Sequence, residues 1–277
     1  MSPEADLHVH TIYSDSTFSP HEVISTASKV SLACIAITDH DAVGGVEEAI
    51  DYGKKVGIEV IPGVELTAEY NDTEIHILGY FIDYKSSWFL EKLQHLRETR
   101  RKRFLQMVEK LKKFNISLDA EKIIRGNLSA SIGRLHLAQE LYRKGYVSSI
   151  KEAFRVYIGE GRPCYVKKER LSPQEAITMI RKLGGISVVA HPYLMGDDNV
   201  IPVLVKEGIE GIEVYHSEHP LSAQIRYMSM AQNYNLLITG GSDCHGLGKG
   251  KVLLGKVRIS YNLVEKLKEY KNARDKT

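Results

Sequence analysis

The sequence predicts an α/β protein in which barrel-like βα units flank an all-helical insertion. Short β-rich runs alternate with amphipathic helical stretches up to about residue 82 and again from about residue 172, as in a parallel sheet covered by helices. Between these two stretches only helical periodicity is present. We therefore predict a first barrel part at residues 1–82, a helical insertion at 83–165 and a second barrel part at 166–277.

The first barrel part opens with a strand, followed by a helix whose start is marked by Ser19 and Glu22. These two residues form a capping box, with proline at the first helical position. The second predicted helix ends at Gly57, a residue suited to a left-handed cap. The predicted strands are 5–7, 33–38, 58–61, 64–70 and 74–82, and the predicted helices are 20–30 and 43–56.

The insertion begins with a long basic helix at 90–114, and helical periodicity continues to about residue 158. The barrel pattern returns at Ser172 and Glu175, which form a second capping box. The remaining predicted strands are 186–190, 211–215, 236–239 and 251–259, and the remaining predicted helices are 173–183, 222–233 and 263–270.

The composition is that of an ordinary soluble globular protein. The 277 residues are 43% hydrophobic and 26% charged, with a net charge of +2, so no global signal for nucleic-acid binding is present. No apolar run is long enough to cross a bilayer, and no signal peptide is evident. We expect a cytoplasmic protein with no membrane partner and no obligate protein partner. The three cysteines are far apart and form no CxxC pair, which argues against disulfides and thiolate zinc sites.

Histidines and carboxylates follow or lie within several of the predicted strands. His8 and His10 are two residues apart on one strand and so project to the same side, which suits two imidazoles on one metal. A single HxH is a weak signal, because histidine also serves many structural roles. Further candidates lie on five other elements: the tetrad Thr38-Asp39-His40-Asp41, Glu65, His76, His191, and the segment Ser242-Asp243-Cys244-His245.

In parallel barrels the catalytic residues gather at the carboxyl ends of the strands. Each histidine alone is better explained by a local hydrogen bond, but six elements that deliver such residues to one rim indicate a metal cluster. Mixed imidazole and carboxylate shells suit Mn²⁺, Fe²⁺ and Zn²⁺, and closely spaced ions need a bridging carboxylate, for which Glu65 is the candidate. A serine or cysteine nucleophile has little support, because no GxSxG motif is present.

These motifs resemble the PHP family, the polymerase and histidinol phosphatase superfamily. The family patterns DxHxH, TDHD, an isolated Glu, an isolated His, AHP and SDxH occur here in order, over roughly residues 6–82 and 172–245. The resemblance implies a distorted (β/α)₇ barrel, the PHP fold, with a trinuclear metal site.

The resemblance also implies how the ligands are shared. His8, His10, Glu65 and Asp243 would hold the first metal, Glu65, His76 and His191 the second, and Asp15, His40 and His245 the third. Two to three divalent ions are expected, with Mn²⁺ preferred and Fe²⁺ or Zn²⁺ as alternatives. Asp15 comes from the resemblance alone, because an aspartate in a Ser/Thr-rich loop is more often a turn former.

Within the family the chain is similar to nucleoside 3′,5′-bisphosphate phosphatases and 5′→3′ exoribonucleases, which carry a helical insertion with a GRPHxA-like motif. Here the motif is Gly133-Arg134-Leu135-His136-Leu137-Ala138, with leucine in place of the usual proline. Arg134 and His136 are candidates to bind a substrate phosphate, and the alternative is an exposed helix face. Lys167 is a further substrate-facing candidate. His219, just past the strand at 211–215, is a candidate to face the substrate and to protonate the leaving oxygen.

The sequence thus predicts an enzyme, a metal-dependent phosphoesterase that hydrolyses nucleotides through metal-activated water, with Glu65 and Asp243 as its central catalytic carboxylates. The substrate is a bisphosphate nucleotide or the 5′ end of a short RNA, which the basic helix would guide unless that helix is simply a solvated face. Two alternatives stay open. One is a histidinol-phosphate phosphatase or another small phosphomonoesterase, and the other is a non-enzymatic scaffold stabilised by metal.

Overall fold

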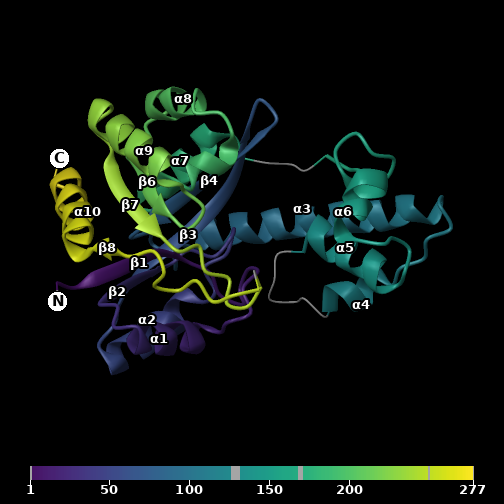
Figure 1. Cartoon of the computed structure of the whole chain (residues 1–277), viewed down its shortest axis with the longest axis horizontal. Coiled ribbons are helices and arrows are strands. Elements are labelled where there is room, and N and C mark those ends of the chain that lie inside the picture. Colours follow the sequence, from purple (N-terminus) through teal and green to yellow (C-terminus); the bar gives the residue numbers. More distant parts are fainter. Residues whose placement is uncertain (1, 126–131, 168–170, 249, 277) are drawn as a thin grey trace. The chain divides into compact units, whose positions relative to one another are not determined.

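The computed structural model describes residues 2–125, 132–167, 171–248 and 250–276. The chain folds as two compact units (Figure 1). Unit 1 combines Met1–Leu90 with Arg170–Thr277, and unit 2 is Glu91–Glu169. Each unit has a hydrophobic core of its own.

Unit 1 is built on an eight-stranded sheet whose strand order is β7-β6-β5-β4-β3-β2-β1-β8. The strands β7 and β1 contact each other, and Val9 and Cys244 form a parallel bridge between the ends of these two strands, so the sheet nearly closes into a barrel. The predicted α/β barrel class is confirmed. The strands are β1 (Glu4–Val9), β2 (Cys34–Ile37), β3 (Glu59–Tyr70), β4 (Thr73–Tyr80), β5 (Ile186–Val189), β6 (Gly211–His216), β7 (Leu237–Gly241) and β8 (Ile259–Ser260).

The prediction of a parallel sheet is wrong at β4, which runs antiparallel to both β3 and β5. Asn71 and Asp72 have φ angles of 47° and 62° and connect the paired residues Tyr70 and Thr73. Two residues with positive φ make the tight turn of a hairpin, so β4 folds directly back on β3 without a crossover helix. The pairs β1·β2, β2·β3, β5·β6 and β6·β7 are parallel, as predicted.

The predicted strand at 251–259 is also wrong, because only its last residue belongs to the two-residue β8, which is antiparallel to β1. Gly250 and Gly255 have φ angles of 81° and 70°, which bend this segment away from an extended path. The backbone N–H of Gly255 donates to Asp6 Oδ2 rather than to a neighbouring strand. Apolar side chains alone therefore do not make a strand here.

Helices cover the outer face of the barrel (Figure 1), for example α9 on β6 and α7 on β3, β4 and β5. Both predicted capping boxes are present, at Ser19–Glu22 and Ser172–Glu175, and Gly57 is the left-handed cap with φ 76°. The helices of unit 1 are α1 (Pro20–Lys29), α2 (Val46–Val56), α7 (Pro173–Lys182), the 3₁₀ helix η2 (Pro192–Met195), α8 (Val200–Lys206), α9 (Leu221–Asn233) and α10 (Tyr261–Arg274).

Unit 2 is helical in all its described secondary structure, and the long helix α3 (Ser87–Lys112) leads into it from unit 1. Its core includes Phe104, Leu111, Leu137 and Leu141, all buried. The other helices are α4 (Ala120–Arg125), α5 (Arg134–Arg143), α6 (Ile150–Ala153) and the π-helix η1 (Phe154–Ile158). Over residues 2–125, 132–167, 171–248 and 250–276, none of the helices combines the length and hydrophobicity that crossing a membrane requires.

Candidate metal centre

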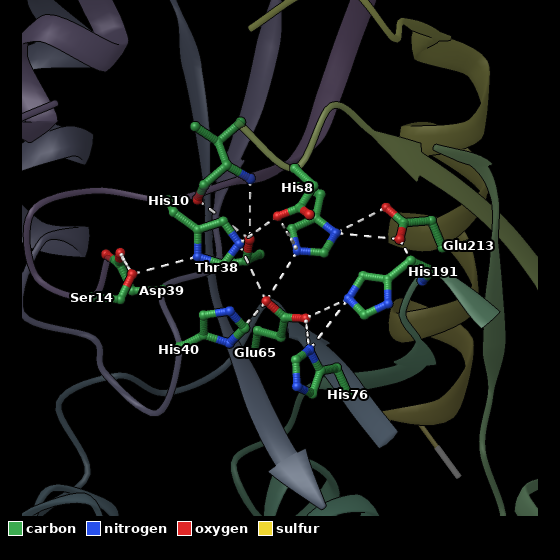
Figure 2. A network of polar contacts seen from close by, with 12 residues as sticks. His8, His10, Ser14, Thr38, Asp39, His40, Glu65, His76, His191 and Glu213 are labelled. Atoms are coloured by element: carbon green, nitrogen blue, oxygen red, sulfur yellow. Dashed lines mark hydrogen bonds and ion pairs between the residues drawn. The ribbon is translucent and has the colours of Figure 1, made fainter. Parts of the chain in front are cut away.

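Glu65, on β3, lies at the middle of a buried cluster of histidines (Figure 2). Its carboxylate is fully buried and faces five imidazole rings. A carboxylate whose two oxygens each face several imidazoles would be placed to share its oxygens between two metal ions. Oε2 lies 3.1 Å from His8 Nε2, 3.2 Å from His10 Nε2 and 3.2 Å from His40 Nδ1, and Oε1 lies 2.9 Å from His76 Nδ1 and 3.0 Å from His191 Nε2.

Strand geometry explains why these side chains meet. His8 and His10 alternate with Val9 on β1 and so point to the same side. In the β3–β4 hairpin Glu65 pairs with Leu78, so His76, two residues away on β4, shares the face of Glu65 diagonally. The hairpin turn that the sequence analysis missed is therefore what brings His76 to Glu65.

Two further carboxylates complete the cluster, Asp243 after β7 and Asp15 in the loop after β1. With them, the structure brings together all nine side chains that the sequence analysis selected as ligands. Asp243 Oδ1 lies 3.1 Å from His10 Nε2, 3.4 Å from His245 Nδ1 and 3.6 Å from His8 Nε2. The oxygens of Asp15 lie 3.1 Å from His245 Nε2, 3.8 Å from His10 Nδ1 and 3.8 Å from His40 Nε2.

The cluster has the composition and spacing of a site for metal ions. Four groups of side chains made only of predicted ligands bring their donor atoms within 4.8 Å of one another. Three of these groups contain Glu65 or Asp243, and the fourth contains Asp15. Several imidazole nitrogens are buried and make no well-directed hydrogen bond among the described residues, although carboxylate oxygens lie close to two of them, and a bound cation would satisfy them. These nitrogens include His10 Nε2, His40 Nδ1 and His191 Nδ1. The residues therefore fit divalent ions.

The charges of the cluster are strongly coupled. Burial alone would raise the pKa of Glu65, but His40, His8 and His76 around it lower the pKa well below the usual range. Burial would lower the pKa of His10, but the carboxylates of Asp243 and Glu65 beside its ring raise it to about 10. The central carboxylate is thus ionised at neutral pH, the form in which a carboxylate binds a cation.

Two of the predicted ligands have a left-handed backbone although they are not glycine. His191 follows β5 with a φ of 27°, and Asp243 follows β7 with a φ of 51°. Such conformations are sparsely populated in residues with a side chain and persist where the surrounding structure holds them. They turn both side chains toward the cluster directly after the strands end.

Two acidic residues of the family motifs, Asp6 and Asp39, hold the segments that carry the proposed ligands Asp243 and Asp15. Asp6 Oδ1 accepts the backbone N–H of Ser242, which ties β1 to the segment that carries Asp243. Asp39 accepts hydrogen bonds from the Thr11 backbone N–H at 2.7 Å and from the Ser14 hydroxyl at 2.6 Å, which fixes the loop that carries Asp15. Both carboxylates are fully buried.

Glu213 belongs to the cluster although no sequence motif predicted it, and His216 lies there without a predicted role. Glu213 is a fully buried acid in β6 that lies 3.0 Å from His8 Nδ1 (Figure 2). His216 Nε2 lies 3.4 Å from Asp243 Oδ2. The available signal was a charged residue inside an otherwise apolar strand, Gly211–Tyr215, which is costly to bury unless it is paired.

The remaining predicted residues divide between the two units. His219 is buried beside His216, with ring centroids 5.1 Å apart, and its Nδ1 donates to the Val214 carbonyl. Arg134, His136 and Lys167 belong to unit 2. The Arg134 guanidinium lies over the rings of Phe154 and Tyr165, His136 Nδ1 accepts the Gly133 backbone N–H, and Lys167 is exposed. Their substrate roles stay predictions.

The sequence matches the family model of the PHP domain over residues 6–162, more than half of the chain. The chain belongs to the PHP domain family. It is 33% identical over 251 residues to a 3′,5′-nucleoside bisphosphate phosphatase from Chromobacterium violaceum, covering 88% of each protein. It is also 32% identical to a 5′-3′ exoribonuclease from Haemophilus influenzae, over 92% of this chain and 94% of the relative.

Among solved structures, this PHP protein is similar to one from Bifidobacterium adolescentis that is described as a metal-dependent phosphoesterase. The two have a TM-score of 0.82 and 28% sequence identity, over 95% of this chain and 94% of the other. The predicted family and the predicted enzyme class, a phosphoesterase, are therefore confirmed at the level of the family.

Proposed function

We propose that this PHP protein hydrolyses phosphate esters of nucleotides with the help of two to three divalent ions. The substrates are 3′,5′-bisphosphate nucleotides, short RNAs that are shortened from the 5′ end, or both. The observation that carries the proposal is the cluster of all nine proposed ligand side chains, Glu65 among them, in a chain that is similar over most of its length to a bisphosphate phosphatase and an exoribonuclease.

The proposed ligands divide into three sites, two of which overlap at Glu65. Glu65 belongs to two of them and bridges, Asp243 completes the first, and Asp15 completes the third. The proposed ligands are His8, His10, Glu65 and Asp243 for the first ion, Glu65, His76 and His191 for the second, and Asp15, His40 and His245 for the third. Mixed nitrogen and oxygen ligands suit Mn²⁺, with Fe²⁺ and Zn²⁺ as the alternatives.

Bound divalent ions would supply Lewis-acid chemistry, polarising phosphoryl oxygens and lowering the pKa of water. The chain's own contribution is to hold the ligands in a pre-organised array that is buried around Glu65 and opens to solvent at Asp15. His219 is the proposed proton-transfer residue. Burial lowers its pKa, and the hydrogen bond from Nδ1 to the Val214 carbonyl leaves Nε2 as the titrating atom. A His219→Gln variant is expected to lower kcat and to remove one limb of the pH profile.

Unit 2 supplies the proposed specificity residues. Arg134 is the candidate for the second phosphate of a bisphosphate nucleotide, because a guanidinium binds phosphate through two parallel hydrogen bonds. An Arg134→Lys variant keeps the charge and loses this geometry, so it should raise KM for a bisphosphate more than KM for a nucleotide with one phosphate. His136 and Lys167 are tested in the same way with His136→Gln and Lys167→Gln.

A substrate panel tests the function directly. Metal-free protein supplied with Mn²⁺ is assayed with 3′-phosphoadenosine 5′-phosphate, a 5′-phosphorylated oligoribonucleotide and histidinol phosphate. Turnover of either nucleotide substrate well above that of histidinol phosphate is expected, and turnover of histidinol phosphate alone would reject the proposal. Cleavage of RNA that falls steeply with salt would favour guidance by the basic helix α3.

A further inference from the structure

Strand β6 contributes a second layer of side chains behind the proposed ligands. Glu213 lies in the middle of this strand and is fully buried. Its Oε1 lies 3.0 Å and its Oε2 3.3 Å from His8 Nδ1, and Oε2 accepts the backbone N–H of His191 at 2.7 Å. One carboxylate thus holds residues that come from β1 and from the end of β5.

The proton positions follow from these contacts. Both oxygens of Glu213 face His8 Nδ1, and Oε2 also accepts the His191 backbone N–H, which is the arrangement of a carboxylate that accepts hydrogen bonds. An ionised carboxylate only accepts hydrogen bonds, so His8 Nδ1 carries a proton and donates it. In the neutral form of the ring, the form that binds a metal, His8 Nε2 then offers the lone pair, and this atom faces Glu65 and Asp243.

His216, at the end of β6, is oriented in the same way. Its Nδ1 accepts the backbone N–H of Glu218 at 3.1 Å, so in the neutral ring the proton is on Nε2. Nε2 is buried, has no other hydrogen-bond partner among the described residues, and lies 3.4 Å from Asp243 Oδ2. The other oxygen of Asp243, Oδ1, faces the histidines of the cluster.

We propose that Glu213 and His216 are positioning residues that fix the metal-facing atoms of His8, His191 and Asp243. This inference rests on the proposed metal centre and goes beyond its nine ligands. A carboxylate that accepts the second N–H of a ligating histidine sets the tautomer and the ring orientation, and loss of such a partner costs about 10–100-fold in metal affinity.

The alternative is that His8, Glu213 and His216 themselves hold an ion, because their donor atoms also lie within 4.8 Å of one another. The two roles differ in what they predict. A positioning role changes the affinity of the neighbouring ions and leaves their number unchanged, whereas a ligand role changes the number of ions bound.

Glu213→Gln is the decisive variant, because it keeps the size of the side chain. A carboxylate can accept from both the His8 ring and the His191 backbone, but a carboxamide has one accepting oxygen and must turn its NH₂ group toward one of these donors. Glu265→Gln, on the exposed face of α10, makes the same charge change away from the cluster and serves as the control.

The measurement is equilibrium dialysis of metal-free protein against Mn²⁺, with metal analysis giving affinity and stoichiometry. We expect Glu213→Gln to bind the same number of ions about 10–100-fold more weakly than wild type and Glu265→Gln to match wild type. Equal affinity of Glu213→Gln and wild type overturns the inference alone, as does a lower stoichiometry with unchanged affinity. A wild type that binds no metal overturns the proposed function as well.

A second pair of variants tests His216 and guards against a simple folding defect. Gln places an amide N–H near the position of Nε2, so His216→Gln should retain most of the affinity that His216→Ala loses. Thermal unfolding of the metal-free proteins is measured in parallel. Equal Mn²⁺ affinity of His216→Ala and wild type would overturn the role of His216.

Discussion

The two units use charged residues in opposite ways. In unit 1 the acids Asp6, Asp39, Glu65 and Glu213 are fully buried, and the first three come from motifs that the sequence analysis recognised. In unit 2 the ion pair between Arg101 and Glu121 is about half exposed, with relative accessibilities of 51% and 49%. Burying a charge costs free energy unless the charge is paired, whereas an exposed charge costs little. The two units therefore place the same kinds of residue in environments with different energetic demands.

This contrast separates function from stability. Unit 2 is held together by an apolar core around residues such as Phe104, Leu111 and Leu137, and its described ion pairs lie at the surface. Unit 1 places its buried charges within its strands or directly after them, and the barrel shields these charges from water. We expect removal of a buried charge in unit 1 to affect chemistry, and removal of a surface charge in unit 2 to affect little.

The largest effect is expected for Glu65→Gln. The change removes the charge that faces five histidines, and loss of the bridged ions removes several kcal/mol of transition-state stabilisation, equivalent to about 10³-fold or more in rate. Turnover of 3′-phosphoadenosine 5′-phosphate with saturating Mn²⁺ measures it, with Glu265→Gln as the control. A variant that retains a tenth or more of the wild-type rate would contradict the bridging role.

Metal removal should distinguish the two units directly. Dialysis against a chelator is expected to abolish turnover, and Mn²⁺ at about 100 times its dissociation constant stabilises the binding unit by about 2.7 kcal/mol. Hydrogen exchange should show the gain in protection in unit 1. Since His10 and His76 lose protons when an ion binds and their pKa values are raised to about 10 and about 9, affinity should tighten as the pH rises.

Asp39→Asn is expected to have an intermediate effect on stability. Asp39 accepts hydrogen bonds from the backbone N–H and the hydroxyl of Thr11 and from the hydroxyl of Ser14. The NH₂ group of an asparagine would replace one of the accepting oxygens and lie against a hydrogen-bond donor. The expected loss is about 1.5–3 kcal/mol in denaturant unfolding of the metal-free protein. Asp51→Asn, on the exposed side of α2, is the control and should unfold as wild type does.

The smallest effect is expected for the surface pair in unit 2. A double-mutant cycle with Arg101→Ala and Glu121→Ala should give a coupling energy below about 1 kcal/mol, because both groups stay solvated and salt screens their attraction. A coupling as large as the cost of Asp39→Asn would show that the contrast between the two units is wrong.

The sequence by itself predicted the elements whose signals are local. The capping boxes at Ser19 and Ser172 and the left-handed cap at Gly57 need only neighbouring residues, and all three are present. The alternation of strands and helices gave the barrel class in the same way. The motifs selected nine side chains that the structure brings together, although their role as ligands stays a prediction that metal binding must test.

Other features depended on contacts between residues far apart in the chain. The strand predicted at 251–259 failed because the Gly255 N–H binds Asp6, 249 residues away in sequence, and no local pattern reveals that contact. The direction of β4 was missed although Asn71 and Asp72 are a turn signal, because the pattern of βα units was extended across it.

Glu213 shows most clearly what only the tertiary structure decided. In the sequence it is one acid within a short apolar strand, and nothing nearby identifies its partners. Closure of the barrel brings His8, from 205 residues earlier, against one side of its carboxylate and the backbone of His191 against the other. Burial then makes both contacts obligatory, because a charged group removed from water must be hydrogen-bonded. The sequence determined which residue types were available, and the closed sheet determined which of them act together.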